Sequence, residues 1–198
     1  MQMTDINFMG VDFGARAAGT TAAAFLKEGS LHVSSVRKNE DADKWLRNQI
    51  DKYDPQFVFI DAPLSLPLIY TRKISNPDYF YRQADRETKA MSPMFLGGLT
   101  ARAIKLRDEY LGKKIEFLET YPKKVSETLI EAHSLKYKKK GKLDDYLVQL
   151  AEKCDCPLFQ NPVNWHEADA VLAWLGGRRY LKGIAIKVGN PEEGIIFF

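Results

Sequence analysis

The chain has 198 residues, of which 45% are apolar and 28% charged, which are ordinary proportions for a globular protein. Its formal net charge of +3 is too small for a polybasic protein, although it excludes neither acidic nor basic partners. No apolar run approaches the length of a membrane-spanning helix, and Met1–Asn7 lacks the apolar region of a signal peptide. We therefore expect one cytoplasmic domain that needs no disulfide or structural metal.

The two cysteines predict no cross-link and no zinc site. Cys154 and Cys156 stand only two positions apart, which is awkward geometry for a disulfide. Structural zinc takes about four ligands, and the histidines at 32, 133 and 166 have no metal-binding spacing to the cysteines. We expect both thiols to be reduced.

The first sixty residues predict strands followed by a helix and another strand. Apolar residues at helical spacing indicate a helix over Glu40–Tyr53, with Asn39 as its N-cap. A tight turn at Glu28–Ser30 joins two of the strands in an antiparallel hairpin. The uninterrupted apolar run Phe57–Ile60 is typical of a strand buried on both faces. The strands before the helix are predicted over Ile6–Val11, Gly19–Lys27 and Leu31–Arg37.

Four prolines interrupt the pattern between Pro63 and Gly98, which we interpret as an insertion with short helices inside a single domain, 1–198. A lysine-rich loop is predicted at Lys136–Lys142. The order of elements indicates a mixed sheet with helices on its faces. The later helices are predicted over Leu99–Leu111, Val125–His133, Leu143–Lys153 and from Asn164 to at least Leu175. The later strands are predicted over Lys114–Leu118, Ile184–Val188 and Gly194–Phe198.

Acidic residues stand where three predicted strands end and inside one apolar helix. Asp12, Asp61 and Glu119 follow apolar strands, and Asp169 lies in a helix that is apolar nearly all round. Acids rarely occupy such places without a partner. Sites in open α/β sheets form at the carboxyl ends of strands, where gathered acids need a cation. Oxygen ligands favour Mg²⁺ or Mn²⁺, as one or two ions, and such ions can support phosphodiester hydrolysis. We therefore predict that these four acids are metal ligands and catalytic residues.

Each of these acids also has a structural interpretation. Asp12 can make an Asx-turn before the glycine that follows it at position 14, and Asp61 can be an ordinary turn acid. Glu119 can pair with a lysine of Lys123–Lys124. Asp169 can be a buried acid that bonds to a neighbouring strand.

Two residues near Asp169 are predicted to support the site. Glu167 follows Asn164 at the spacing of a capping box, so it either caps the helix or makes an outer contact with the metal. His166 shares a helix face with Asp169. We expect His166 to pack against the metal ligands or to hold them in place rather than to bind the metal itself.

Six motifs span almost the whole chain and together resemble one family. They are Gly10-Val11-Asp12, Ile60-Asp61-Ala62-Pro63-Leu64-Ser65-Leu66-Pro67, Arg82-Gln83-Ala84-Asp85-Arg86, Glu119-Thr120-Tyr121-Pro122, Glu167-Ala168-Asp169-Ala170 and Glu193-Gly194-Ile195-Ile196. The chain resembles the predicted nucleases of ribonuclease H-like fold that are catalogued as domain of unknown function 429. The stretch Ile60–Pro67 is the most specific of these motifs.

The resemblance implies a fold and a site. The fold is an α/β ribonuclease H-like fold with a mixed five-stranded sheet, its first three strands antiparallel, flanked by helices and carrying an insertion at about 63–98 after the fourth strand. In that fold, acids on the first strand, after the fourth strand and on the last helix bind metal ions. Asp12, Asp61 and Asp169 match these positions, and Glu119 matches an additional acid of the family. The layout is also similar to Holliday-junction resolvases, which usually carry two acids on one face of the last helix, whereas Glu167 and Asp169 are two positions apart.

Two groups of basic residues are candidates for contacts with nucleic acid. The loop Lys136–Lys142 holds five lysines in seven positions, and its phosphate contacts would be independent of base sequence and sensitive to salt. A solvated loop is the alternative. Its candidate contacts are Lys138, Lys139 and Lys140.

The insertion supplies the second basic group. Arg82 and Arg86 stand among tyrosines and a phenylalanine, a combination that suits stacking on single-stranded or splayed bases. The same residues can pack on the core instead, and Arg82 can pair with Asp85 across one helical turn.

These observations lead to three hypotheses about function. The first is a divalent-metal-dependent nuclease that hydrolyses phosphodiester bonds of DNA or RNA. The second is a non-catalytic module that binds nucleic acid or protein. The third, an actin-like phosphotransferase, is disfavoured because the chain has no glycine-rich Walker loop. The expected partner is nucleic acid, with no membrane and with a homo-oligomer as a possibility.

Overall fold

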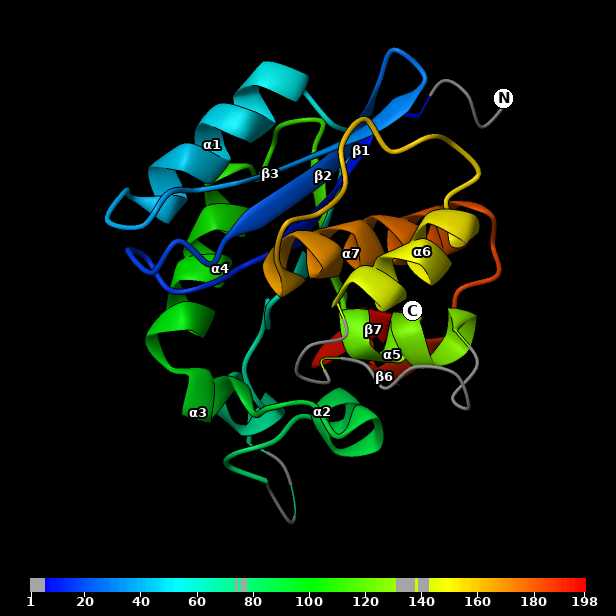
Figure 1. Ribbon diagram of the computed structural model, residues 1–198. Helices are drawn as coiled ribbons and strands as arrows, with labels where there is room; N and C mark the ends of the chain where they lie inside the picture. Colours follow the sequence, from blue (N-terminus) through cyan, green and yellow to red (C-terminus); the bar gives the residue numbers. More distant parts are fainter. Residues whose placement is uncertain (1–5, 74, 76–77, 131–137, 139–142) are drawn as a thin grey trace.

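The computed structural model describes residues 6–73, 75, 78–130, 138 and 143–198. Its centre is a seven-stranded mixed sheet in the order β3-β2-β1-β4-β5-β7-β6 (Figure 1). The pairs β1–β4, β4–β5 and β5–β7 are parallel, whereas β1–β2, β2–β3 and β6–β7 are antiparallel. The strands are β1 (Phe8–Asp12), β2 (Ala22–Lys27), β3 (Ser30–Ser35), β4 (Phe57–Asp61), β5 (Glu116–Thr120), β6 (Lys187–Asn190) and β7 (Gly194–Phe197).

The expectation of a five-stranded sheet is wrong, because the sheet has seven strands. The two additional strands form the β6–β7 hairpin, which joins the sheet where Glu119 and Thr120 of β5 pair with Ile196 and Phe197 of β7. The segments that make this hairpin have the strand-like pattern noted near the end of the sequence, and the resemblance left them out of the sheet. The fold is therefore an α/β fold around a seven-stranded mixed sheet, without assignment to the ribonuclease H-like class.

Helices cover both faces of this sheet. One face packs against α1 (Ala42–Tyr53) and α4 (Gly98–Glu109), and the other against α5 (Pro122–Leu129), α6 (Leu143–Lys153) and α7 (Trp165–Leu181) (Figure 1). Side chains alternate along β1 as strand geometry requires. Met9 and Val11 enter the core beneath α1 and α4, so Gly10 and Asp12 face α7.

Helix α7 lies directly on β1 because Gly10 has no side chain. A Cβ atom at Gly10 would stand 2.1 Å from the backbone nitrogen of Trp174 and 2.5 Å from the carbonyl oxygen of Ala170. Gly177 makes a second close approach, where a Cβ would stand 2.2 Å from the ring of Phe59 on β4. The two glycines thus bring α7, and with it Asp169, down onto the central strands.

The predicted boundaries of α1 need one correction. Asp41, not Asn39, is the N-cap, because its Oδ1 accepts hydrogen bonds from the backbone nitrogens of Asp43 and Lys44 at 3.0 and 3.1 Å. Asn39 has a φ of 69°, the left-handed conformation that asparagine tolerates in turns. The helix ends at Tyr53, as predicted.

The insertion contains the short helices that its prolines predict: the 3₁₀ helix η2 (Leu68–Tyr70), α2 (Gln83–Thr88) and α3 (Pro93–Leu96). The carboxylate of Glu193, next to β7, accepts hydrogen bonds at 2.7 Å from the backbone nitrogens of Leu68 and Gln83. Because η2 and α2 share this acceptor, the insertion is fixed to the end of the sheet (Figure 1).

The remaining predictions concern the second half of the chain. Helix α5 begins at Pro122, earlier than expected, and α6 spans the predicted residues. Residues 131–133 of the predicted helix lie outside the described residues, as does the lysine-rich loop apart from Lys138. Within the described ranges, no helix is long and apolar enough to cross a membrane.

Candidate functional site

Three of the predicted acids meet at the carboxyl end of the central strands. Asp12 and Asp61 end β1 and β4 and are direct neighbours in the parallel pair. Because they are in register, both side chains point toward α7, which carries the fully buried Asp169. Burial, and then the negative charges of Asp12 and Asp169, raise the pKa of Asp61 well above its usual range. We call Asp12, Asp61 and Asp169 the carboxylate cluster.

Lys138 supplies a positive charge to the carboxylate cluster. Its Nζ lies 2.6 Å from Oδ2 of Asp169. Burial opposes the charged form of Lys138, yet the nearby carboxylates of Asp169, Asp12 and Asp61 raise its pKa. The sequence predicted Lys138 as a phosphate contact, whereas here it contacts protein. The other two predicted lysines, Lys139 and Lys140, lie outside the described residues.

His166 contacts the cluster from the first turn of α7. Its Nδ1 lies 2.7 Å from Oδ2 of Asp12. This hydrogen bond raises the pKa of His166, since it favours the protonated imidazole. The geometry makes His166 a group that orients the carboxylate of Asp12.

Asn164 is the N-cap of α7 as the spacing predicted, but Glu167 does not close the capping box on the backbone of Asn164. Oδ1 of Asn164 accepts from the backbone nitrogen of Glu167 at 2.9 Å and caps α7. The carboxylate of Glu167 accepts from the backbone nitrogen of Val163 at 2.9 Å and from the hydroxyl of Ser35 at 2.8 Å. It therefore ties the start of α7 to the end of β3, with both oxygens engaged, rather than making an outer contact with a metal.

Glu119 does not join the carboxylate cluster, because of the register of β5. Glu119 pairs with Ile60 rather than Asp61. Its side chain therefore points away from the sheet on the face opposite to the one that carries Asp12 and Asp61. There its Oε2 lies 2.6 Å from Nη1 of Arg82, and its Oε1 accepts from the backbone nitrogen of Leu64 at 2.9 Å. Neither predicted lysine is its partner; that partner is Arg82, a residue from the insertion.

Arg82 lies in a buried network instead of facing solvent as a phosphate contact would. Its Nη2 lies 2.7 Å from Oδ1 of Asp85 and its Nε 3.0 Å from Oδ2. Nη1 reaches both Glu119 and the hydroxyl of Ser65, the latter at 2.8 Å. Arg82 is 1% exposed. The spacing of Arg82 and Asp85 predicted their pairing, but nothing local predicted Glu119. We call Arg82, Asp85 and Glu119 the Arg82 network.

Arg86, the other predicted arginine, lies on the surface. It makes an ion pair with Asp78 at 2.6 Å and covers the ring of Tyr81, with 3.9 Å between the guanidinium carbon and the ring centre. Its side chain is 59% exposed, so it remains accessible to a phosphate group.

A cavity of about 250 Å³ opens beside these groups. Asp12 and Asp61 line it together with Arg82 and Glu119. The rest of its wall includes apolar residues that the sequence did not single out, because nothing in the sequence distinguishes an apolar residue of a cavity wall from one of the core. They are Phe13, Met91, Leu96 and Leu99.

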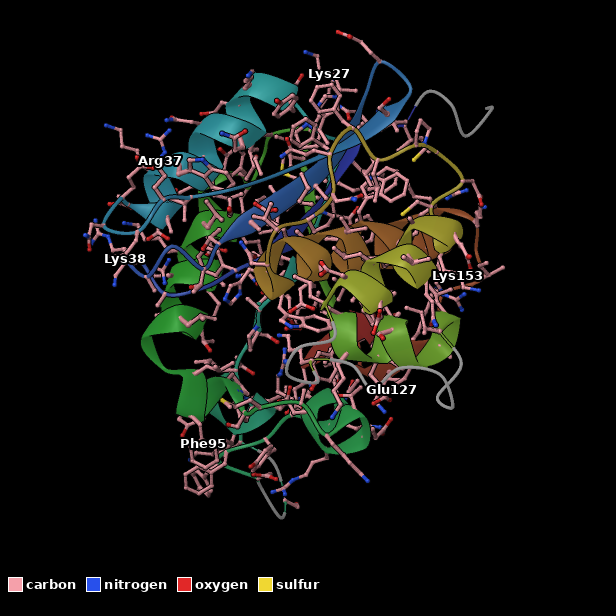
Figure 2. The ribbon with its side chains drawn as sticks, viewed as in Figure 1. Lys27, Arg37, Lys38, Phe95, Glu127 and Lys153 are labelled. Carbon is pink, nitrogen blue, oxygen red and sulfur yellow. The ribbon has the colours of Figure 1, made fainter. Side chains whose placement is uncertain are left out.

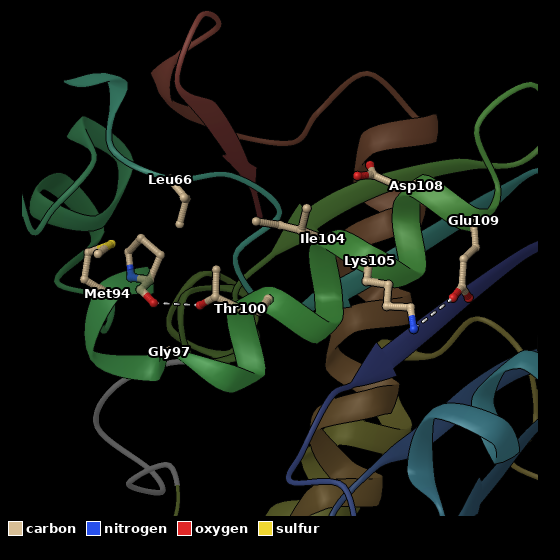
Figure 3. A pocket seen from close by; sticks show the side chains of 10 residues that line it. Leu66, Met94, Gly97, Thr100, Ile104, Lys105, Asp108 and Glu109 are labelled. Carbon is tan, nitrogen blue, oxygen red and sulfur yellow. Dashed lines mark hydrogen bonds and ion pairs between the residues drawn. The ribbon is translucent and has the colours of Figure 1, made fainter. Parts of the chain in front are cut away.

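A larger hollow of about 720 Å³ lies against α3 and α4 (Figure 3). Leu66, Met94 and Ile104 give it an apolar lining, and the hydroxyl of Thr100 donates to the carbonyl of Pro93 at its rim. None of its described lining residues belongs to the smaller cavity. Its described lining therefore includes no residue of the carboxylate cluster.

The donor atoms of the carboxylate cluster fit a magnesium or manganese ion in kind but not in spacing. All three side chains offer carboxylate oxygens, the ligands these ions prefer. Among the described residues, however, no three His, Cys, Asp or Glu side chains stand close enough together to hold an ion. Metal binding would require Lys138 to leave Asp169 and the carboxylates to turn toward one another.

Comparisons with known proteins do not add to this picture. No family model matches the chain, and no curated protein shows significant sequence similarity to it. The function must therefore be inferred from the site itself.

Proposed function

We propose that the protein is a divalent-metal-dependent hydrolase that cleaves phosphodiester bonds of nucleic acid. The observation that supports this proposal is the carboxylate cluster: three acids come together from β1, β4 and α7, and burial, followed by the charges of Asp12 and Asp169, raises the pKa of Asp61. Strongly perturbed acids in a cavity are typical of functional sites, and carboxylate oxygens brought together in this way are the ligands that Mg²⁺ and Mn²⁺ prefer.

The residues at the carboxylate cluster would have different roles in this reaction. Asp12, Asp61 and Asp169 would hold one or two Mg²⁺ or Mn²⁺ ions, which, when bound, supply charge for phosphate and an acidified water. His166 keeps the carboxylate of Asp12 oriented. Lys138, displaced from Asp169, becomes available to a phosphate oxygen. The apolar wall of the cavity limits access of bulk water.

A second candidate function rests on the ion pair between Lys138 and Asp169. If that lysine neutralises the cluster permanently, the chain is a module that binds nucleic acid or protein without cleaving it. The two candidates differ in whether divalent ions displace Lys138.

Calorimetry with Mn²⁺ and Mg²⁺ tests the proposal. We expect micromolar to low-millimolar binding to the wild type that Asp12→Asn and Asp61→Asn abolish. The matched control is Glu116→Gln, which neutralises an exposed acid at the other end of β5. The same four proteins are then screened for metal-dependent cleavage of single-stranded, duplex and branched DNA and RNA. Metal binding that is unaffected by both aspartate variants, or no metal binding with or without nucleic acid, would contradict the proposal.

A further inference from the structure

The cavity at the carboxylate cluster has one charged and one apolar part. Asp12, Asp61 and the pair of Arg82 and Glu119 supply charge. Phe13, Leu96 and Leu99 supply apolar surface. Its volume of about 250 Å³ is below the roughly 300–1,000 Å³ of sites for drug-sized ligands. Such a space suits one small, flat, apolar group beside a phosphate.

An exposed apolar patch continues the cavity onto the surface of the insertion. Met91 lines the cavity and is also 61% exposed. Phe80 and Phe95 are 53% and 62% exposed, and their rings stack with 5.7 Å between centres. The hydroxyl of Ser92, next to Met91, donates to the carbonyl of Phe80 and holds these parts together. We call Phe80, Met91 and Phe95 the aromatic patch, and Figure 2 shows Phe95 projecting from the end of α3.

The position of the aromatic patch indicates what it binds. Apolar surfaces of this kind mark binding sites rather than ordinary surface, and bases of any sequence stack on aromatic rings. Arg86, over the ring of Tyr81, adds a positive charge beside Phe95, which makes an edge contact with the same ring. A phosphodiester at the carboxylates would place its own base or its neighbour's base on this surface. Bases inside a duplex are already paired and stacked, so their faces are not available to stack on these side chains.

We propose that the cavity and the aromatic patch bind unpaired bases, which makes single-stranded or splayed nucleic acid the substrate class. This inference rests on the proposed function, since the cluster has to receive the phosphate. It assigns Met91 and Phe95 as contacts that select the substrate. It leaves the choice between DNA and RNA to the experiment.

Fluorescence anisotropy with Ca²⁺ in place of Mg²⁺ or Mn²⁺ tests this inference, because the carboxylates need a divalent ion to receive a phosphate and Ca²⁺ lacks the strict octahedral geometry of Mg²⁺. The probes are labelled oligodeoxythymidylate, oligouridylate and a blunt DNA duplex. We expect the single strands to bind at least tenfold more tightly than the duplex, and Met91→Ala and Phe95→Ala each to weaken single-strand binding about tenfold. The slope of log Kd against log salt should stay unchanged, because neither substitution removes a charge.

Phe159→Ala is the matched control, since Phe159 is 65% exposed but stacks on His32 at the β3 edge. It should bind single strands like the wild type. Thermal unfolding midpoints equal to that of the wild type would show that the patch variants are folded. Equal affinity for duplex and single strand, patch variants that bind like the wild type, or no binding of any probe would overturn the inference.

Cleavage assays in Mn²⁺ separate this inference from the proposed function. Metal-dependent cleavage by wild type and patch variants alike, with unchanged affinity, would leave the hydrolase standing and remove the single-strand surface. Tight, patch-dependent binding of single strands without cleavage would do the reverse. Asp61→Asn, which should bind but not cleave, shows that the two readouts are independent.

Discussion

The charged residues beside the cavity form two groups, which differ in how completely their charges are paired and hydrogen-bonded. In the Arg82 network, one guanidinium lies between two carboxylates, and each charge has directional hydrogen bonds. In the carboxylate cluster, three acids share Lys138 and a hydrogen bond to His166. Burial raises the pKa of Glu119 in the first group and of Asp61 in the second, but Arg82 opposes the rise at Glu119, whereas Asp12 and Asp169 add to the rise at Asp61. Both groups contribute residues to the wall of the same cavity.

The difference shows what each group contributes. A buried charge with saturated hydrogen bonds holds two segments together, here the insertion and β5. A group whose like charges repel one another weakens the fold, and proteins retain such groups mainly at functional sites. The balanced group is therefore structural and the repelling group is the candidate site.

The largest effect is expected from breaking the balanced group. Arg82→Met leaves Asp85 and Glu119 buried without their cation, which should lower the free energy of unfolding by about 3–5 kcal/mol, measured by urea denaturation. Adding Asp85→Asn and Glu119→Gln removes the unpaired charges and should restore most of this loss. A loss below about 1 kcal/mol for Arg82→Met alone would show that the network is not balanced as described.

A second prediction concerns Lys138, whose Nζ lies 2.6 Å from Oδ2 of Asp169. Lys138→Met removes the charge that competes with a metal for Asp169, so Mn²⁺ should bind about tenfold more tightly in calorimetry. Lys105→Met is the control, because Lys105 pairs with Glu109 on α4. Unchanged Mn²⁺ affinity in Lys138→Met would mean that the lysine and the ion do not compete.

A third prediction tests the repulsion within the cluster. Asp61→Asn should raise the free energy of unfolding by about 1 kcal/mol at neutral pH, because it removes a charge that burial and its neighbours disfavour. Since the folded-state pKa of Asp61 is raised, lowering the pH protonates Asp61 first in the folded protein. The gain from Asp61→Asn should therefore shrink as the pH falls and vanish below the unfolded-state pKa.

Asp41→Asn is the control for that measurement and should have the opposite sign. The hydrogen bond from Arg16 lowers the pKa of Asp41 to about 2, so its charge favours folding and its removal should destabilise the protein. If both substitutions changed the free energy of unfolding equally, the charge of Asp61 would not be disfavoured in the folded protein.

The smallest effect is expected at the surface pair of Arg86 and Asp78. Arg86→Ala removes an exposed ion pair and should lower the free energy of unfolding by less than about 1 kcal/mol. Single-strand binding, in contrast, should become weaker and less dependent on salt. If Arg86→Ala lowered the free energy of unfolding as much as Arg82→Met, the description of Arg86 as a surface residue with little structural role would be wrong.

The sequence predicted the strands, most helices and the positions of the acids along them more accurately than it predicted which residues the acids contact. Apolar runs and periodicity located β1, β4 and α7, and the ends of β1 and β4 placed Asp12 and Asp61 at one edge. The partner of Glu119 was missed because facing depends on register. A shift of one residue in the register between β4 and β5 would turn the side chain of Glu119 to the other face of the sheet. No local sequence pattern specifies this register.

Two other differences have physical causes of the same kind. The β6–β7 hairpin joins the sheet through pairing with β5, a contact between segments far apart in the chain. The cap of α1 falls at Asp41 because two carboxyl-to-backbone hydrogen bonds form there, although Asn39 is an equally good cap by residue type. Interactions across long distances, and competition between similar residues, limit what a sequence alone can specify.

Gly10 has a consequence for how the site tolerates change. Because α7 touches the bare backbone of β1 there, the depth of Asp169 is set by main-chain contact rather than by the fit of bulky side chains. Neighbouring core residues can then be exchanged for others of similar volume while the acids keep their spacing. Position 10 itself cannot be exchanged in this way, so a residue without any functional group helps to set the geometry of the site.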